Sequence, residues 1–320
     1  MRILHFWDGR RGTPRRLQID FVKKLANHCE FYVYGKNEDA HNGKEMSPIV
    51  YQTSRNIQEI VDELKADILL IPEWAIGRNV IGLKDCKIPI VMMEVDWYAT
   101  DQCDQDFYKN NNIEHIITRA PVSFEDQGIK SVWLPLSVNN KEFYTNPNTN
   151  YLHGRKNKVT FVGAGPGSRN KFYIDRIKAI NKLNNSEHFE SVGIRYPSIY
   201  ASTLKEYIGA LSCSFSELKM APAKVWEIMA CGCALLVSDF YYRKRLFGEE
   251  ECMFIYKNDL SDIDDKVNEI VSDLDKVKAY TKTALNVIQN RHLDSHRILE
   301  LYNILKAINE GKEIPKIWGL

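Results

Sequence analysis

Short apolar segments alternate with longer amphipathic segments along the chain, and the alternation is interrupted once near the middle. The short segments are rich in β-branched residues, as buried strands are, and the longer ones have the spacing of amphipathic helices. Because parallel strands need a crossover between them, the pattern predicts parallel sheets covered by helices. In the first half, strands are expected over Arg2–Trp7, Glu30–Tyr34, Asp67–Ile71, Pro89–Met93, Glu114–Thr118 and Lys130–Leu134, with helices over Arg15–His28 and Ile57–Lys65.

The interruption is the polar segment Asn139–Lys158, which contains turn signals and is interpreted as a linker. The predicted fold class is therefore α/β, with two Rossmann-like domains facing a cleft and further helices at the C-terminus. We expect an N-terminal domain over 1–145 and a C-terminal domain over 146–320, whose last helix is a candidate to pack back on the first domain. After the linker, strands are expected over Val159–Gly163, Phe189–Ile194, Gly209–Phe215 and Ala234–Ser238, and helices over Asn170–Leu183, Ala223–Ala230, Asp259–Ser272, Leu274–Gln289 and Ser295–Glu310.

Composition adds limits on the class of protein. The chain has 320 residues, 44% of them hydrophobic, which is enough for two full-sized cores. Its net charge of +1 gives no overall attraction to nucleic acid or to acidic membranes. No apolar run has the length of a membrane span or a signal peptide, so we expect a cytoplasmic protein without a transmembrane segment. The seven cysteines are expected to be reduced thiols, and the pair Cys231 and Cys233 lacks the spacing of a zinc site.

The segment Ser216–Asp239 carries the clearest chemical signal. It predicts a loop, a helix that starts at Pro222, a tight turn at Gly232 and a buried strand. Lys224 and Glu227 lie three residues apart and therefore on one face of the helix. Such a lysine can bind a phosphate, and such a carboxylate can accept hydrogen bonds from ribose hydroxyls. The alternative is an ordinary crossover helix with an ion pair on its surface.

The residues from Pro222 to Asp239 resemble the pattern P-x-K-x-x-E-x-M-A-C-G-x-x-x-x-x-S/T-D of GT-B glycosyltransferases, especially the large retaining clan and its spore-maturation-type relatives. The resemblance implies that Glu227 binds the ribose of a sugar-nucleotide donor. Many members carry a second glutamate seven residues earlier, which faces the sugar. The chain has Lys219 and Met220 in that region instead, so the contacts to the sugar stay unassigned. The implied donor-binding residues of this segment are Lys219, Met220, Ala221, Pro222, Lys224 and Glu227.

A second glycine-rich segment, Val159–Arg169, contains Gly163 and Gly165 and resembles the start of the C-terminal domain in the same family. Glycines after a strand let the backbone approach a phosphate, but the spacing is not that of a dinucleotide-binding fingerprint. The resemblance implies that Arg169 neutralises the donor diphosphate, whereas a capped helix with a solvated arginine is the alternative. Arg195 follows another predicted strand and is a further candidate for the donor site.

The N-terminal half supplies the candidates for the acceptor side. Asp8, Gly9, Arg10 and Arg11 follow the first predicted strand, where an open basic loop would suit an anionic acceptor, although solvated charge is a common alternative. Asp96 follows the strand Pro89–Met93 in a loop that resembles the D-x-W/Y loop of spore-maturation-type relatives. An aspartate that only caps the loop is an equal alternative.

Together these residues predict a glycosyltransferase that moves a sugar from a nucleotide-sugar donor to an unidentified acceptor, whether a glycan, a protein or a modified polynucleotide. Asp96, Arg169 and Lys224 are the catalytic candidates. No convincing D-x-D motif lies at a strand end, so no metal and no other cofactor are expected, and the resemblance implies retention of anomeric configuration. A GT-B-type sugar-nucleotide epimerase and a non-catalytic two-domain ligand-binding protein are the alternatives; a nicotinamide oxidoreductase lacks its fingerprint. The oligomeric state stays open. His292 and Arg297, in a segment that resembles the end of the family's C-terminal domain, are expected to be structural.

Overall fold

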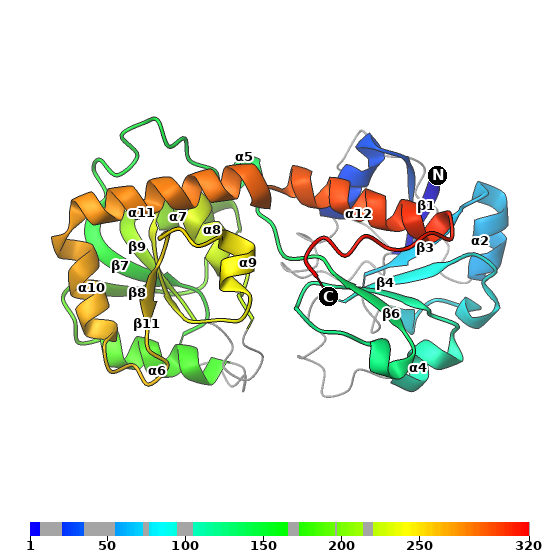
Figure 1. Cartoon of the computed structure of the whole chain (residues 1–320), viewed down its shortest axis with the longest axis horizontal. Coiled ribbons are helices and arrows are strands. Elements are labelled where there is room, and N and C mark those ends of the chain that lie inside the picture. Colours follow the sequence, from blue (N-terminus) through cyan, green and yellow to red (C-terminus); the bar gives the residue numbers. More distant parts are fainter. Residues whose placement is uncertain are drawn as a thin grey trace. The chain divides into compact units, whose positions relative to one another are not determined.

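The computed structural model describes residues 1–6, 21–34, 55–72, 77–94, 105–165, 173–195, 197–213 and 220–319, and these form two compact units (Figure 1). The first unit contains Met1–Pro135 together with Ser295–Leu320, and the second contains Leu136–Asp294. The sequence-based division after residue 145 falls inside the second unit. The reason is that the segment before it packs there: Phe143 is buried against Tyr200, and Lys205 Nζ donates to the carbonyl of Tyr144 at 3.3 Å.

The first unit is built on a parallel sheet with the strand order β2-β1-β3-β4-β5-β6. All six strands lie where the sequence predicts them; β2 has the predicted bounds, β4 is shifted by one residue at both ends, and the others differ by one residue at one end. Their bounds are β1 Arg2–Phe6, β2 Glu30–Tyr34, β3 Ile68–Ile71, β4 Ile90–Glu94, β5 His115–Thr118 and β6 Lys130–Trp133. The described part also has helices α2 Ile57–Leu64, α4 Gln105–Asn110 and α12 Asp294–Asn309, and 3-10 turns at Lys23–Asn27, Leu83–Asp85 and Glu125–Gln127.

Apolar helix faces cover this sheet on both sides. In α2, the buried residues Ile57, Ile60 and Val61 form one stripe, and they pack in a cluster that contains Leu4 and Leu69. Neighbouring strand residues point to the opposite face of the sheet, where Ile3 and Ile68 pack against Ile298, Leu301 and Leu305 of α12. The C-terminal helix is therefore part of the core of the first unit.

The second unit is built on a parallel sheet with the strand order β11-β10-β9-β7-β8. The sequence predicts four of its strands, and misses β11 because three residues are too few for a period to be visible. The strand bounds are β7 Lys156–Val162, β8 Phe189–Val192, β9 Tyr207–Ser212, β10 Ala234–Ser238 and β11 Phe254–Tyr256. The helices are α5 Asn140–Phe143, α6 Ile174–Leu183, α7 Pro197–Lys205, α8 Lys224–Ala230, α9 Arg243–Phe247, α10 Ile263–Ser272 and α11 Leu274–Val287, followed by a π-helical turn at Ile288–His292.

Both sheets have the connectivity of doubly wound folds. From β7 the chain first adds β8 on one side and then returns to add β9 on the other, as β1 does with β2 and β3 in the first unit. Helix α6 lies on one side of the second sheet, and α7 and α8 lie on the other (Figure 1). In such sheets ligands bind outside the carboxyl ends of the strands, where the winding direction reverses. In the second unit this point lies between the ends of β7 and β9, next to Gly163 and Cys213.

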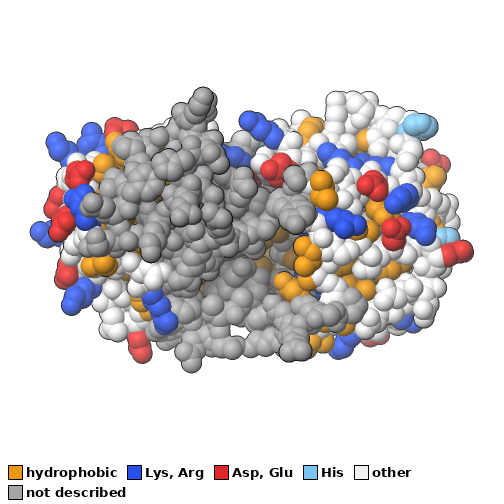
Figure 2. Space-filling view, turned by 180° about the vertical axis from the view of Figure 1, so that it is seen from behind, with side chains coloured by type: hydrophobic (Ala, Val, Ile, Leu, Met, Phe, Trp, Pro, Cys, Tyr) orange, Lys and Arg blue, Asp and Glu red, His pale blue; other side chains and the backbone are white. Residues whose placement is uncertain are grey.

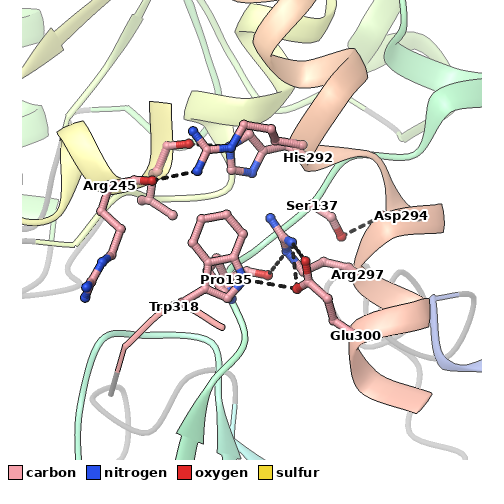
Figure 3. Close-up of polar contacts among 10 residues, drawn as sticks. Pro135, Ser137, Arg245, His292, Asp294, Arg297, Glu300 and Trp318 are labelled. Carbon is pink, nitrogen blue, oxygen red and sulfur yellow. Dashed lines mark hydrogen bonds and ion pairs between the residues drawn. The ribbon is translucent and has the colours of Figure 1, made fainter. Parts of the chain in front are cut away.

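The chain passes between the units twice, after Pro135 and after Asp294. The residues on either side of these two points are held by contacts within the unit to which they belong (Figure 3). In the second unit Ser137 Oγ donates to Asp294 at 2.8 Å, and the backbones of Val138 and Leu293 pair. In the first unit the fully buried Arg297 donates to the carbonyl of Pro135 at 3.0 Å, and its Nη1 donates to both carboxylate oxygens of Glu300 at 2.8 Å. The indole N–H of Trp318 donates to the same carboxylate.

These contacts account for Arg297, and His292 has a similar explanation. Its ring lies fully buried in the second unit, with Nε2 2.7 Å from the carbonyl of Leu246 (Figure 3). Both side chains are therefore structural, as the sequence predicts.

The described surface mixes charges of both signs. In the view of Figure 2, basic and acidic side chains are interspersed over the described parts of the face, in line with the net charge of +1. Within the described ranges, no helix combines the length and the apolar character that a membrane span requires. All the cysteines that the structure describes are free thiols, and Cys231 and Cys233 are buried packing residues.

Candidate functional site

Helix α8 sets up the candidate site, and it begins at Lys224 rather than at Pro222. The prediction of Pro222 as the first helical residue is wrong, because the chain first makes a turn in which Val225 N–H donates to the carbonyl of Pro222 at 3.0 Å. Helix α8 then buries its apolar residues against β10 and its surroundings, and leaves Lys224 and Glu227 one turn apart.

The end of α8 is confirmed at Gly232. This residue has φ +66, a conformation that glycine adopts at little cost, and its N–H donates to the carbonyl of Met229 at 3.0 Å. A Cβ at this position would lie 2.9 Å from the ring of Tyr151, so a side chain would not fit. The tight turn passes the chain directly into β10, which fixes α8 against the sheet.

The side chain of Lys224 reaches the carboxyl end of β7. Its Nζ donates to the carbonyl of Val162 at 2.7 Å and to the hydroxyl of Tyr200 at 3.0 Å. A Cβ on Gly163 would lie 3.3 Å from both Cε and Nζ of this lysine, so the absence of a side chain there permits the close approach. The ammonium group therefore lies where the winding of the second sheet reverses.

Tyr200 joins the two predicted ligands of the donor. Its hydroxyl accepts a hydrogen bond from Lys224 and donates one to the carboxylate of Glu227. The ring of Tyr200 lies 4.6 Å from Lys224 Nζ and packs edge-on against Phe143 at 5.9 Å. Lysine, tyrosine and glutamate thus form one connected polar group, with a cation and a carboxylate held by a shared hydroxyl.

Burial shifts the protonation of all three side chains. It lowers the pKa of Lys224 to about 8; the carboxylate of Glu227 opposes this shift and the guanidinium of Arg176 adds to it. Burial raises the pKa of Glu227, against the opposing effects of Lys224 and of the hydrogen bond from Tyr200. Burial and then the charge of Glu227 raise the pKa of Tyr200 well above its ordinary value. Perturbed groups gathered at a strand end are typical of functional sites.

The sequence does not reveal Tyr200, Phe161 or Arg176. Tyr200 lies on α7, a helix that was not predicted; its only sequence signals are Pro197 at the first position and the apolar pair Ala201 and Leu204. In the sequence, Phe161 is indistinguishable from an ordinary apolar strand residue. In the structure, the centre of its ring lies 5.6 Å from Lys224 Nζ and 5.5 Å from the guanidinium carbon of Arg176.

The remaining donor candidates lie in different settings. Met220, Ala221 and Pro222 are buried in the turn before α8. Gly165 follows β7, and no atom of the described residues lies within 4 Å of the position of a Cβ there. Arg195 is exposed in the loop after β8. Seven predicted site residues lie outside the described residues: Asp8, Gly9, Arg10, Arg11, Asp96, Arg169 and Lys219.

Comparisons with known proteins define the class. Residues 156–303 match the model of a family described as glycosyl transferase-like. A search of curated proteins found no match. Among solved structures, the chain is similar to HepE from Anabaena, solved in complex with UDP and glucose, at 12% identity and a TM-score of 0.67 over 96% of this chain and 100% of that one.

Two further structures give the same result. A glycosyltransferase from Rickettsia africae has 14% identity and a TM-score of 0.68, over 96% of this chain and 98% of that one. Sucrose-phosphate synthase from Thermosynechococcus elongatus has 11% identity and a TM-score of 0.64, over 98% and 100%. At these identities the likeness shows the fold, which is the α/β fold of GT-B proteins with two Rossmann-like domains.

The chain has the fold of GT-B proteins, and its residues 156–303 match the glycosyl transferase-like family, so both comparisons support a glycosyltransferase. The segment that matches the glycosyl transferase-like family includes β7, α7 and α8, the elements that carry Lys224, Glu227 and Tyr200. The predicted resemblance, fold class and class of enzyme are therefore confirmed.

The lowered pKa of Lys224 can be measured directly. In protein labelled with ¹⁵N-lysine, the Nζ signal that disappears in Lys224→Arg should titrate near pH 8, because burial disfavours the ammonium form. Since this pKa is below the value of an unfolded lysine, the unfolded chain binds more protons above pH 8. The free energy of unfolding should then rise from about pH 8 to 10 by more in the wild type than in Lys224→Met. A Lys224 signal that titrates above pH 10 would contradict the burial argument.

Proposed function

We propose that the chain transfers a sugar from a nucleotide-sugar donor to an acceptor, and that the second unit binds the donor at the carboxyl end of β7. The observation that carries this proposal is the group of Lys224, Tyr200 and Glu227, in which one hydroxyl joins an ammonium and a carboxylate at the point where the winding of the sheet reverses. Lys224 binds the diphosphate, and Glu227 accepts hydrogen bonds from the ribose hydroxyls.

The comparisons support a donor of this class. HepE from Anabaena is solved in complex with UDP-glucose and, separately, with UDP. The segment that matches the glycosyl transferase-like family contains the whole Lys224–Glu227 turn. The donor we propose is accordingly a nucleotide-sugar, with its base and sugar to be identified by screening.

The proposed reaction needs charge stabilisation more than it needs a strong base. The bond between the anomeric carbon and the diphosphate oxygen breaks, the acceptor oxygen bonds to that carbon, and the acceptor hydroxyl gives up its proton. Negative charge grows on the departing diphosphate, and a fixed ammonium in a partly buried site stabilises it strongly. We propose that Lys224, together with Arg169, provides this charge without a metal ion. The family resemblance favours retention of anomeric configuration.

The acceptor side rests on residues outside the described ranges. We propose that Asp96 binds acceptor or sugar hydroxyls and that the basic loop Asp8–Arg11 favours an anionic acceptor, which is a glycan, a protein or a modified polynucleotide. Measuring transfer to neutral and phosphorylated forms of one glycan would test the preference for charge.

Glu227 provides the most direct test of the donor site. Thermal shifts with UDP, GDP, ADP and dTDP first identify the nucleotide that stabilises the wild type most. Glu227→Ala should then weaken binding of that nucleotide by about 10- to 100-fold, since hydrogen bonds to a charged group contribute about 1.5–3 kcal/mol. Glu206→Ala is the matched control, because this exposed glutamate of the same unit forms an ion pair with Lys156 at 3.4 Å. Equal nucleotide affinity of Glu227→Ala and the wild type in calorimetry would refute the assignment.

Chelation tests the proposed independence of metal. With the identified donor, slow hydrolysis to free sugar and nucleoside diphosphate should continue at an unchanged rate in excess EDTA, because side chains supply the positive charge. Loss of hydrolysis in EDTA that returns on addition of Mg²⁺ or Mn²⁺ would show that a metal carries the leaving group instead.

A further inference from the structure

Arg176 is a buried cation for which the described residues provide no polar partner. It lies on α6 with 7% of its surface exposed, and its Nε is buried without a hydrogen bond. Its guanidinium carbon lies 3.9 Å from the ring centre of Tyr173 and 5.5 Å from that of Phe161. No hydrogen bond or ion pair within the described part of the chain involves this side chain. Its charge is in contact with aromatic rings instead.

Another arginine of the same unit shows what a structural role requires. Arg155 also lies near an aromatic ring, at 5.9 Å from Tyr151, but its guanidinium donates to four backbone carbonyls and one thiol. These bonds link the residue directly before β7 to the turn at Gly232. Burying a guanidinium without such partners costs several kcal/mol. Cation–π contact recovers only part of that, at about 0.5–2 kcal/mol.

The position of Arg176 indicates what compensates its charge. Phe161 is the common neighbour of Arg176 and Lys224, with its ring 5.5 Å from the guanidinium carbon of one and 5.6 Å from Nζ of the other. The charge of Arg176 disfavours the protonated form of Lys224, as the pKa of that lysine records. Two cations beside one ring repel each other until an anion binds between or beside them.

We propose that Arg176 is a further cation of the anion site at the carboxyl end of β7, and that it binds the donor diphosphate together with Lys224. The identity of the anion rests on the proposed function, whereas the position of the anion site rests on the structure. The two cations differ in a useful way. A guanidinium keeps its charge at every physiological pH, whereas Lys224 loses its proton near pH 8. Arg176 therefore keeps the site cationic when Lys224 is neutral.

The test compares Arg176→Met with Arg155→Met in the full chain, with inorganic pyrophosphate as the probe. Without ligand, Arg176→Met should melt at or above the wild-type temperature because it removes an uncompensated buried charge. Arg155→Met should melt lower, because it leaves buried carbonyls without donors. Pyrophosphate should stabilise the wild type and Arg155→Met, whereas its Kd should rise at least tenfold in Arg176→Met. Arg176→Lys should recover part of the affinity.

Several results would overturn the assignment. These are an unchanged pyrophosphate Kd in Arg176→Met, no stabilisation of the wild type by pyrophosphate, and loss of unliganded stability or of folding in Arg176→Met to the extent seen in Arg155→Met. The Kd of a nucleoside diphosphate, measured in parallel, distinguishes failure of the Arg176 assignment from failure of the proposed function. If it binds the wild type and Arg176→Met equally, the donor site stands and Arg176 is not part of it. If pyrophosphate binds through Arg176 and no nucleotide binds, the anion site stands and the proposed donor does not.

Discussion

The hydrogen bond from the ammonium of Lys224 to the carbonyl of Val162 is the contact on which the account of this protein depends. It joins the first residue of α8 to the last residue of β7, two elements that are far apart in the sequence. The bond is possible because β7 ends in Gly163, where a side chain would crowd the lysine. Because β7 lies between β8 and β9, this bond places the ammonium at the point where the winding of the sheet reverses.

The site is built at a cost to the stability of the unliganded protein. Burial disfavours the charged forms of both Lys224 and Glu227, as the directions of their pKa shifts show. Tyr200 reduces that cost by bonding to both groups, while among the described residues Arg176 has aromatic rings beside it but no hydrogen-bond partner. Groups held in an unfavourable charged state before the ligand arrives need little reorganisation when it binds. An anion that binds the ammonium of Lys224 and the guanidinium of Arg176 would gain the interaction with charges that are already oriented.

The sequence predicts most of the fold but only part of the candidate site. Strands such as β2 and β10 were located to the residue because they are continuous apolar runs, and α2 because its buried residues follow a helical period. Helix α7 and strand β11 escaped because they are short or lack a period. Lys224 and Glu227 were found through the spacing of a family pattern. Tyr200 and Arg176 were not found, because only the folded sheet brings them to the end of β7. Their contacts join residues that lie 15, 24 or 62 positions apart in the chain, and no local sequence pattern indicates such contacts.

The most direct test of the central claim is a crystal structure of the protein with its stabilising nucleoside diphosphate bound. The account predicts the diphosphate within hydrogen-bonding distance of Lys224 Nζ and the ribose hydroxyls on the carboxylate of Glu227, at the carboxyl end of β7. A nucleotide bound at the sheet of the first unit, with Lys224 still donating only to Val162 and Tyr200, would contradict it.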